Sequence, residues 1–409
     1  MVFIYPMRKI TLPWQILIAF ILAVIFGHYF PKEVKYVEWM GEIFIRALKM
    51  IIIPLIFSSL VSGITNIGKP GNLGRLGIKT IGYYLLTSTI AILTGLLFVN
   101  IIQPGIGANL GLSKDIENLG LTEDSLSETL IKIVPTNIFQ AFSTGQMLSV
   151  IFFAILFGFF ITRISGESKT MLTGFFNAIF EVMMQITKFI IMFTPLGIFG
   201  IIAKQIAEVP SLSDFAGSMG IYMLTVILSL FIHAFVSLPL LTKWLGQAKP
   251  FKHLKNMGSP LLTAFSTSSS SATLPLTMSA VEYNAGVSNK VSSFTLPLGA
   301  TINMDGTALY ECVAALFIAQ AYGMDLTVGQ QFIVVVTALL ASIGAAGIPM
   351  AGLVMISVIL SAVGLPLEGV GLILAVDRIL DMFRTATNVW SDSCGAVIIA
   401  KSEGESLNV

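Results

Sequence analysis

Charged side chains are scarce in this sequence. Of its 409 residues only 11% are Asp, Glu, Lys or Arg, whereas 55% are hydrophobic. Soluble domains carry about 25% charged residues, so this composition excludes an ordinary soluble domain. We expect an all-α polytopic membrane protein embedded in the lipid bilayer of the cell (plasma or inner) membrane.

The net charge is close to zero, and cysteine and histidine are rare. A formal net charge of +1 provides no electrostatic attraction to nucleic acid. The two cysteines, Cys312 and Cys394, lie in apolar surroundings, which argues against a disulfide framework. So few His and Cys ligands argue against zinc or copper. We interpret His28, His233 and His253 as structural or interfacial residues and expect no cofactor besides coupling ions.

Long hydrophobic runs, by contrast, are abundant in the first 242 residues. Runs long enough to cross a bilayer at about 1.5 Å per residue cover 12–30, 41–66, 77–102, 147–164, 174–202 and 217–242. No cleavage site follows the first run, so it predicts a transmembrane helix rather than a signal peptide. Basic residues gather in alternate connections and acidic residues in the loop from about 104 to 146. The positive-inside rule therefore predicts a cytoplasmic amino terminus, and we expect the carboxyl terminus on the same side.

The hydrophobic runs in the last third are interrupted at their centres. Residues 257–281 form two apolar arms around the serine cluster 268–271, and residues 332–360 form two arms around a centre with Gly and Pro. A segment with polar residues at its middle follows each pair, at 303–307 and at 377–392. Paired broken segments indicate a transporter site built on inverted repeats, with the irregular backbone lining a cavity. We predict eight transmembrane helices plus two re-entrant helical hairpins.

The segment 377–392 carries a polar stripe. In a helix, Asp377, Asp381, Arg384, Asn388 and Asp392 recur at steps of three and four residues and share one face. A charge at mid-bilayer costs roughly 2.5 to 3.5 kcal/mol, so several on one face predict an inward-facing site. Interhelical hydrogen bonding is the alternative for any single position, but it does not account for five positions together.

The inward groups are predominantly anionic. Asp305, Asp377, Asp381 and Asp392 outnumber Arg384, and such an excess of negative charge in a dehydrated place requires cations. Oxygen ligands suit hard ions. Sodium is the cation that this pattern favours.

Two residues of the stripe indicate the substrate. Arg384 offers a fork of donors that matches a carboxylate, and Asp381, one turn earlier, is placed to receive an ammonium group. The serine cluster 268–271 can supply donors to an α-carboxylate. Together these groups predict L-glutamate or L-aspartate.

Five motifs resemble the glutamate transporter family of dicarboxylate/amino acid:cation symporters. They are SFTLPLGATINMDGTALYE (293–311), ASIGAAGIPMAG (341–352), DxxxDxxRTxxN (377–388), YYLLTST (83–89) and IVPTN (133–137). The resemblance covers nearly the whole chain. It implies a homotrimer in which each protomer has a static scaffold and a mobile transport part that moves as an elevator.

The resemblance also implies a division of the chain 1–409. The scaffold would comprise 1–76 and 104–242, and the transport part 77–103 and 250–409, with hairpin 1 at 257–281 and hairpin 2 at 332–360.

Site residues follow from the resemblance as well. The substrate contacts it implies are Ser269, Ser270, Thr307, Ile348, Gly352, Asp381, Arg384, Thr385 and Asn388. One sodium site would use Gly299, Asn303, Asn388 and Asp392. A second would use Tyr84, Thr87, Ser88, Asn303 and Asp305. A third would use Thr301, Ser342, Ile343 and Ala345 near Met304.

Four positions bear on ion coupling and charge. Glu311 stands where sodium-only archaeal relatives have glutamine and mammalian carriers have glutamate, which is associated with proton coupling. The resemblance therefore implies proton co-transport and leaves potassium counter-transport open. Ser268 and Met382 replace arginines of the archaeal and mammalian relatives respectively, and Arg378 is a candidate for the missing charge.

Sodium-driven uptake of acidic amino acids is the leading function, and its alternatives are weaker. A C4-dicarboxylate carrier would use Arg384 but leave Asp381 without an ammonium partner, and neutral amino acid carriers of the family lack this arginine. A channel would be a side activity, because the hairpin tips resemble gates. An intramembrane protease is disfavoured because the serine cluster has no nearby base. We predict that the protein is not an enzyme.

Overall fold

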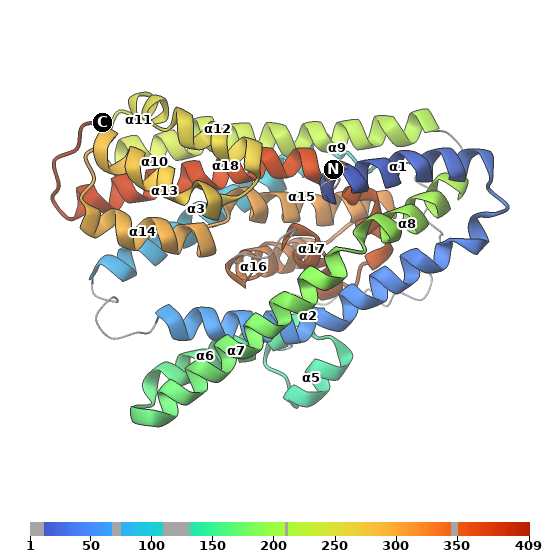
Figure 1. The fold of residues 1–409 in the computed structure, drawn as a ribbon, viewed down its shortest axis with the longest axis horizontal. Coiled ribbons are helices and arrows are strands. Elements are labelled where there is room, and N and C mark those ends of the chain that lie inside the picture. The colour runs from blue at the N-terminus through green and yellow to red at the C-terminus, as the bar shows by residue number, and fades with distance from the viewer. Residues whose placement is uncertain (1–11, 68–74, 109–130, 132, 209–211, 345–350) are drawn as a thin grey trace, which may run out of the picture.

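Helices make up all the regular structure of the part of the chain that the computed structural model describes, residues 12–67, 75–108, 131, 133–208, 212–344 and 351–409 (Figure 1). The first half comprises α1 (Leu12–Tyr29), η1 (Val34–Tyr36), α2 (Glu38–Ile67), α3 (Arg75–Ile102), α5 (Ile138–Thr144), α6 (Met147–Arg163), α7 (Gly166–Ile191) and α8 (Thr194–Glu208). The second comprises α9 (Leu212–Ile232), η3 (His233–Ser237), α10 (Leu238–Trp244), α11 (Pro250–Asn256), α12 (Gly258–Thr267), α13 (Ser270–Ser279), η4 (Ala280–Asn284), α14 (Asn289–Ile302), α15 (Asp305–Ala321), α16 (Val328–Gly344), α17 (Ala351–Ala362), η5 (Leu367–Gly369) and α18 (Val370–Ser402). The all-α class is thus confirmed for these residues.

Five helical stretches of the described residues are long and apolar enough to cross a membrane. They are Glu38–Thr65, Arg75–Ile102, Gly166–Ile191, Phe215–Trp244 and Asn289–Ala321. Shorter apolar helices add Trp14–Tyr29, Ser149–Arg163, Thr194–Ala207 and Val328–Ser342. This set supports a multi-pass membrane protein.

The single span expected over 174–202 is wrong, because the chain divides there into α7 and α8. Met192 and Phe193 close α7 with a turn, and α8 begins at Thr194 with Pro195 in its first turn. Proline has no N–H to donate and its ring clashes with the carbonyl four residues earlier, so Pro195 is favourable in the first turn of α8 and unfavourable in a continuation of α7. Hydropathy is high on both sides and does not reveal the break.

The helices pack in two groups, which Figure 1 shows with α2, α6 and α7 along one side and α9, α12 and α18 along the other. In the first group, α1 packs on α8, and α2 packs on α6, α7 and α8. In the second, α3 packs on α15 and α9, and α18 packs on α12, α14 and α15. The groups meet where α2 contacts α16 and α17 and where α8 contacts α18.

Glycines permit the close helix approaches of the first group and of its border. A Cβ atom on Gly200 of α8 would lie 2.6 Å from the backbone nitrogen of Gly41 in α2. At the border, a Cβ atom on Gly371 of α18 would collide with the side chain of Ile201 in α8. Both contacts need a residue without a side chain.

Each of the two interrupted runs contains two helices that pack on each other. In the first run, α12 ends at Ser268, whose φ of +50° is left-handed, and Ser269 starts α13 by accepting the backbone N–H of Ala272 at 3.2 Å. Serine is a favoured residue at this cap position. In the second run, α16 and α17 are the two arms, and the tip at 345–350 lies outside the described residues.

The carboxyl-terminal residues 403–409 fasten α18 to other helices of the second group. Glu403 Oε1 lies 2.6 Å from Lys79 Nζ and 3.1 Å from Arg75 Nε, both in α3. Two hydrogen bonds, chiefly that from Lys79 and also that from Arg75, lower the pKa of Glu403 to about 2. Glu405 accepts the backbone N–H of Ser288 at 2.8 Å, directly before α14. The tail therefore links α18, α3 and α14.

Candidate functional site

A break between α14 and α15 exposes backbone groups in the middle of the second group. Asn303 (φ −94°, ψ 89°) and Met304 (φ −116°, ψ 56°) are not helical, and α15 restarts at Asp305. Helix ends leave carbonyl oxygens and N–H groups without helical partners, so this break presents both to one place. The polar segment expected at 303–307 therefore contains an interruption of the helix at 303–304.

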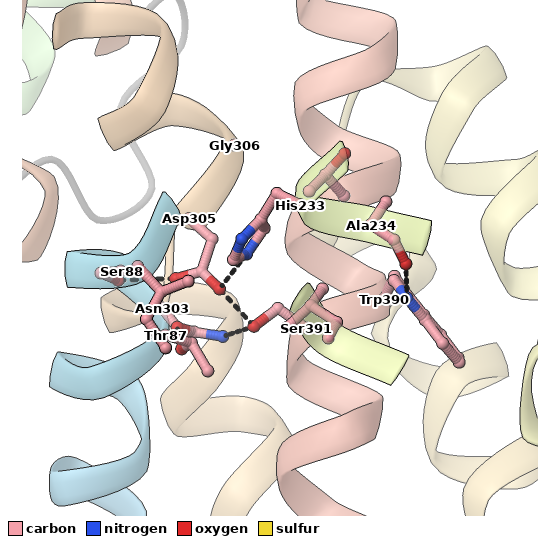
Figure 2. Close-up of polar contacts among 12 residues, drawn as sticks. Thr87, Ser88, His233, Ala234, Asn303, Asp305, Gly306, Trp390 and Ser391 are labelled. Carbon is pink, nitrogen blue, oxygen red and sulfur yellow. Dashed lines mark hydrogen bonds and ion pairs between the residues drawn. The ribbon is translucent and has the colours of Figure 1, made fainter. Parts of the chain in front are cut away.

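Asp305 lies fully buried at this break and contacts three other segments (Figure 2). Its Oδ1 accepts the hydroxyl of Ser88 in α3 at 2.6 Å, and its Oδ2 accepts the hydroxyl of Ser391 in α18 at 2.6 Å. His233 Nε2 of η3 lies 3.2 Å from the same Oδ2. One carboxylate thus joins α3, η3, α15 and α18.

A second buried carboxylate, Asp392, lies beside the first. Asn303 Nδ2 donates to Asp392 Oδ1 at 2.9 Å, and its Oδ1 accepts the Thr87 hydroxyl at 3.4 Å. A Cβ atom on Gly299 would lie 2.6 Å from the Tyr84 hydroxyl and would collide with the Asp392 carboxylate. Glycine at 299 therefore lets the α14 backbone approach these two oxygens.

This donor set fits sodium. Carboxylate, amide, hydroxyl and backbone oxygens are the ligands of hard cations. Asp305 and Asp392 are both buried, and no Lys or Arg of the described chain forms an ion pair with either. Buried carboxylates need compensating charge, which bound cations would supply.

The structure brings together the residues of the first two expected sodium sites. Hydrogen bonds or close approaches connect the residues of these two sites to the network around Asp305 and Asp392. They are Tyr84, Thr87, Ser88, Gly299, Asn303, Asp305, Asn388 and Asp392. For the third site, Thr301, Met304 and Ser342 are placed, Ile343 is described only as helix backbone, and Ala345 lies outside the described residues.

Arg384 forms the centre of a neighbouring site on α18. Its side chain is 2% exposed, and its Nη2 lies 2.8 Å from Asp381 Oδ1 and 3.1 Å from Asp377 Oδ1. Its Cζ lies 4.0 Å from the ring centre of Tyr310, a cation–π distance. Nε and Nη1 have no hydrogen-bond partner among the described residues, so part of the guanidinium fork is available to a ligand.

Four of the remaining expected substrate residues lie on α15, α17 and α18. Gly352 of α17 is near, because a Cβ atom on it would lie 2.5 Å from Arg384 Nη1. Thr307, Thr385 and Asn388 are buried, and Asn388 Oδ1 accepts the Gly306 N–H at 2.7 Å while its Nδ2 donates to Thr307 at 3.3 Å.

The hairpin residues expected to contact substrate are less directly placed. Ser269 and Ser270 are half-buried between α12 and α13, both of which pack on α18. No hydrogen bond joins either serine to Arg384 in the described part. Ile348 lies outside the described residues.

Glu311 and Arg378, which bear on charge, have different environments. Glu311 of α15 is fully buried, and neither carboxylate oxygen has a hydrogen-bond partner in the described residues. Arg378 has 43% of its side chain exposed, and its Nη1 lies 3.7 Å from Asp381 Oδ2.

Three residues of these networks, Asp377, Ser391 and His233, had no binding role assigned from the sequence. Asp377 was in the polar stripe but received no role, although it contacts Arg384 and accepts the Tyr310 hydroxyl at 2.8 Å. Ser391 directly precedes Asp392, which is a signal for its position. His233 was interpreted as structural, and an isolated histidine in an apolar run gives no signal of a polar partner.

Comparison with known proteins assigns the class. The model of the "Sodium:dicarboxylate symporter family" matches residues 12–402, and the chain belongs to this family. The family consists of transporters, so the protein is not an enzyme.

Three relatives illustrate the range of similarity. A proton/sodium-glutamate symport protein of Bacillus caldotenax is 40% identical over 411 residues, covering 98% of this chain and 96% of the relative. The excitatory amino acid transporter 3 of Homo sapiens is 38% identical over 429 residues, covering 92% and 81%. The proton/glutamate-aspartate symporter of Escherichia coli is 35% identical over 413 residues, covering 97% and 93%.

Proposed function

We propose that this protein is a secondary active symporter that takes up L-glutamate or L-aspartate across the cell membrane, driven by sodium. The observation that carries the proposal is a buried arginine beside a carboxylate, Arg384 and Asp381, next to the buried carboxylates of Asp305 and Asp392. Among the described residues, two donors of Arg384 have no partner and no Lys or Arg pairs with Asp305 or Asp392. The names of the relatives, which combine glutamate or aspartate with sodium or protons, support it.

The substrate would replace interactions that the protein makes with itself. Its side-chain carboxylate would accept from Nε and Nη1 of Arg384, and its ammonium group would take the Asp381 oxygen that now accepts from Arg384. Thr307, Thr385 and Asn388 offer further polar groups, and the hairpin serines are proposed donors for the α-carboxylate. A C4-dicarboxylate would satisfy the arginine but leave Asp381 without a positive partner.

Coupling between ion and substrate would pass through the helix break. Asp305 belongs to the proposed sodium sites, and the next residue, Gly306, donates its N–H to Asn388 of the proposed substrate site. An ion that orders residues 303–305 would therefore also order the groups that bind substrate, which is the structural requirement for a positive coupling free energy.

Alternating access would move the second helix group against the first. In this proposal the first group is a scaffold that forms a homotrimer, the second group is an elevator, and the arm pairs α12–α13 and α16–α17 are re-entrant hairpins. The amino and carboxyl termini would be cytoplasmic. Because α9 packs on α3, α15 and α18, we place α9, η3 and α10 with the mobile part instead of within a scaffold extending over 104–242.

Glu311 is the proposed proton carrier. Burying an ionised carboxylate without a partner is costly, and a bound proton removes that charge. Potassium counter-transport is the remaining option of the sequence analysis, with the same buried carboxylates as its ligands.

The test uses purified protein in proteoliposomes with labelled L-aspartate outside. Uptake should require an inward sodium gradient, vanish when choline replaces sodium, and be inhibited by unlabelled glutamate far more than by succinate. Uptake that continues without sodium contradicts the proposal, and equal inhibition by succinate would favour the dicarboxylate alternative.

A further inference from the structure

His233 occupies an irregular turn in an otherwise continuous helical stretch. Residues His233–Ser237 form the π-helical turn η3 between α9 and α10, and His233 is fully buried. Such turns are rare and occur frequently at functional sites, because they re-aim side chains that a regular helix would place elsewhere. Trp390 Nε1 of α18 donates to the carbonyl of Ala234 at 2.9 Å, which fixes the turn next to His233 (Figure 2).

The contacts of His233 identify it as a donor. Its Nε2 lies 3.2 Å from Asp305 Oδ2, and its Nδ1 has no hydrogen-bond partner in the described chain. A carboxylate oxygen accepts here, so the imidazole donates from a hydrogen on Nε2.

The two oxygens of Asp305 accept different numbers of hydrogen bonds. Oδ2 receives two donors, His233 and Ser391, whereas Oδ1 receives the single hydroxyl of Ser88. Figure 2 shows His233 and Ser391 on one side of the carboxylate and Ser88 and Thr87 on the other, while the Asn303 amide donates to Ser391 at 3.0 Å and accepts from Thr87 at 3.4 Å. A cation that uses the Thr87 and Asn303 oxygens would therefore meet Oδ1, with its remaining lone pair.

We propose that His233 is a positioning residue for sodium: with Ser391 it holds Asp305 Oδ2, so that Oδ1 faces the cation between α3 and the break at 303–304. This inference rests on the proposed function, in which Asp305 is a sodium ligand. Partners behind a metal ligand fix its orientation, and their removal typically weakens metal affinity by roughly 10- to 100-fold.

The test compares His233→Gln with His233→Asn, which carry the same neutral amide but differ by one methylene in reach. Gln can place its N–H near the position of Nε2, and Asn cannot. We expect the sodium concentration for half-maximal aspartate uptake to rise about tenfold or more in His233→Asn and to stay within about threefold of the parent in His233→Gln. The KM for aspartate at saturating sodium should change little in either.

A second readout avoids transport altogether. Sodium titrated onto the purified protein without substrate should raise its midpoint of thermal unfolding, with the half-effect concentration displaced in His233→Asn as in the uptake assay. His28→Asn, which changes an exposed histidine in the last turn of α1, is the control and should leave the sodium requirement unchanged.

The inference is overturned if His233→Asn has the sodium requirement of the parent, or if folded His233→Gln is as impaired as His233→Asn. If the His233 variants do not fold, Trp390→Phe, which releases the turn, should raise the sodium requirement by about threefold or more, and an unchanged value overturns the inference. A parent protein that responds to no sodium at all would instead refute the proposed function.

Discussion

Arg384 and Tyr310 bind the same carboxylate oxygen. Arg384 Nη2 lies 3.1 Å from Asp377 Oδ1, and the Tyr310 hydroxyl donates to that oxygen at 2.8 Å. The guanidinium also lies over the Tyr310 ring. Arg384 is thus held from two directions, and within the described residues its Nε and Nη1 have no hydrogen-bond partner, which pre-organises the fork for a ligand.

This relationship predicts unequal effects of Asp377→Asn and Tyr310→Phe. Asp377→Asn leaves a buried guanidinium short of one negative partner, so Arg384 should hold Asp381 more tightly and compete with the substrate ammonium. We expect the KM for aspartate to rise by about 30-fold or more, corresponding to about 2 kcal/mol. Tyr310→Phe removes one hydrogen bond and should raise it by about fivefold. A larger effect of Tyr310→Phe would contradict the assigned role of Asp377.

Replacement of Arg384 tests the substrate carboxylate site. Arg384→Cys removes the charged donors, and aspartate affinity should fall by about 30-fold or more, while neutral amino acids become inhibitors of the residual binding. Competition of labelled aspartate binding measures both. Arg163→Cys, at the exposed end of α6 in the first helix group, is the control and should retain affinity within about threefold. Retained aspartate affinity in Arg384→Cys would refute the assignment.

Glu311→Gln tests proton coupling. Gln cannot carry a proton in the transport cycle, but it is nearly the same size as the buried glutamic acid. Exchange of internal for external aspartate should therefore persist, while net uptake loses its dependence on external pH. Rates of both processes between pH 5.5 and about 8 provide the measurement. Glu368→Gln, at a site with 58% side-chain exposure, should keep the parental pH profile, and the same profile in Glu311→Gln would exclude a proton role.

His253 predicts an acid-sensitive stability. Burial, partly offset by the Ser393 backbone, lowers the pKa of His253 from 6.5 to about 4. Between these values the unfolded chain binds a proton that the folded protein does not, so stability rises with pH across this window and is lost as pH falls below 6.5. The effect reaches about 3 kcal/mol near pH 4.

Thermal unfolding of the detergent-solubilised protein at pH 7.5, 6 and 5 would measure this effect. His253→Leu should show a smaller decline in midpoint between pH 7.5 and 5 than the parent, although it loses some stability at every pH. An identical decline in both proteins would show that other groups dominate the acid response.

The polar stripe of α18 was predictable because helical periodicity alone decides which residues share a face. Asp381, Arg384, Asn388 and Asp392 needed no tertiary information to be placed together. The interruption at Asn303 was likewise visible as polar residues within an apolar run. Such local patterns carried most of the candidate site.

His233 could not be predicted in the same way. Its partner Asp305 lies 72 positions further along the chain, and the contact depends on a π-turn that shifts the helical register. Periodicity analysis assumes a constant 3.6 residues per turn and cannot register such a shift. The break before Pro195 was missed for a related reason, since hydropathy averages over short turns.

The tail that follows α18 has a practical consequence for labelling. Because Glu403 and Glu405 bond to Lys79 and Ser288, a reporter joined beyond Val409 leaves these anchors in place. Shortening the chain to Ser402 before attaching a fluorophore would instead remove the contacts that hold the starts of α3 and α14 to the tail. A fluorescence change in such a truncated protein would then report both the increased motion of these helix ends and any response to solute.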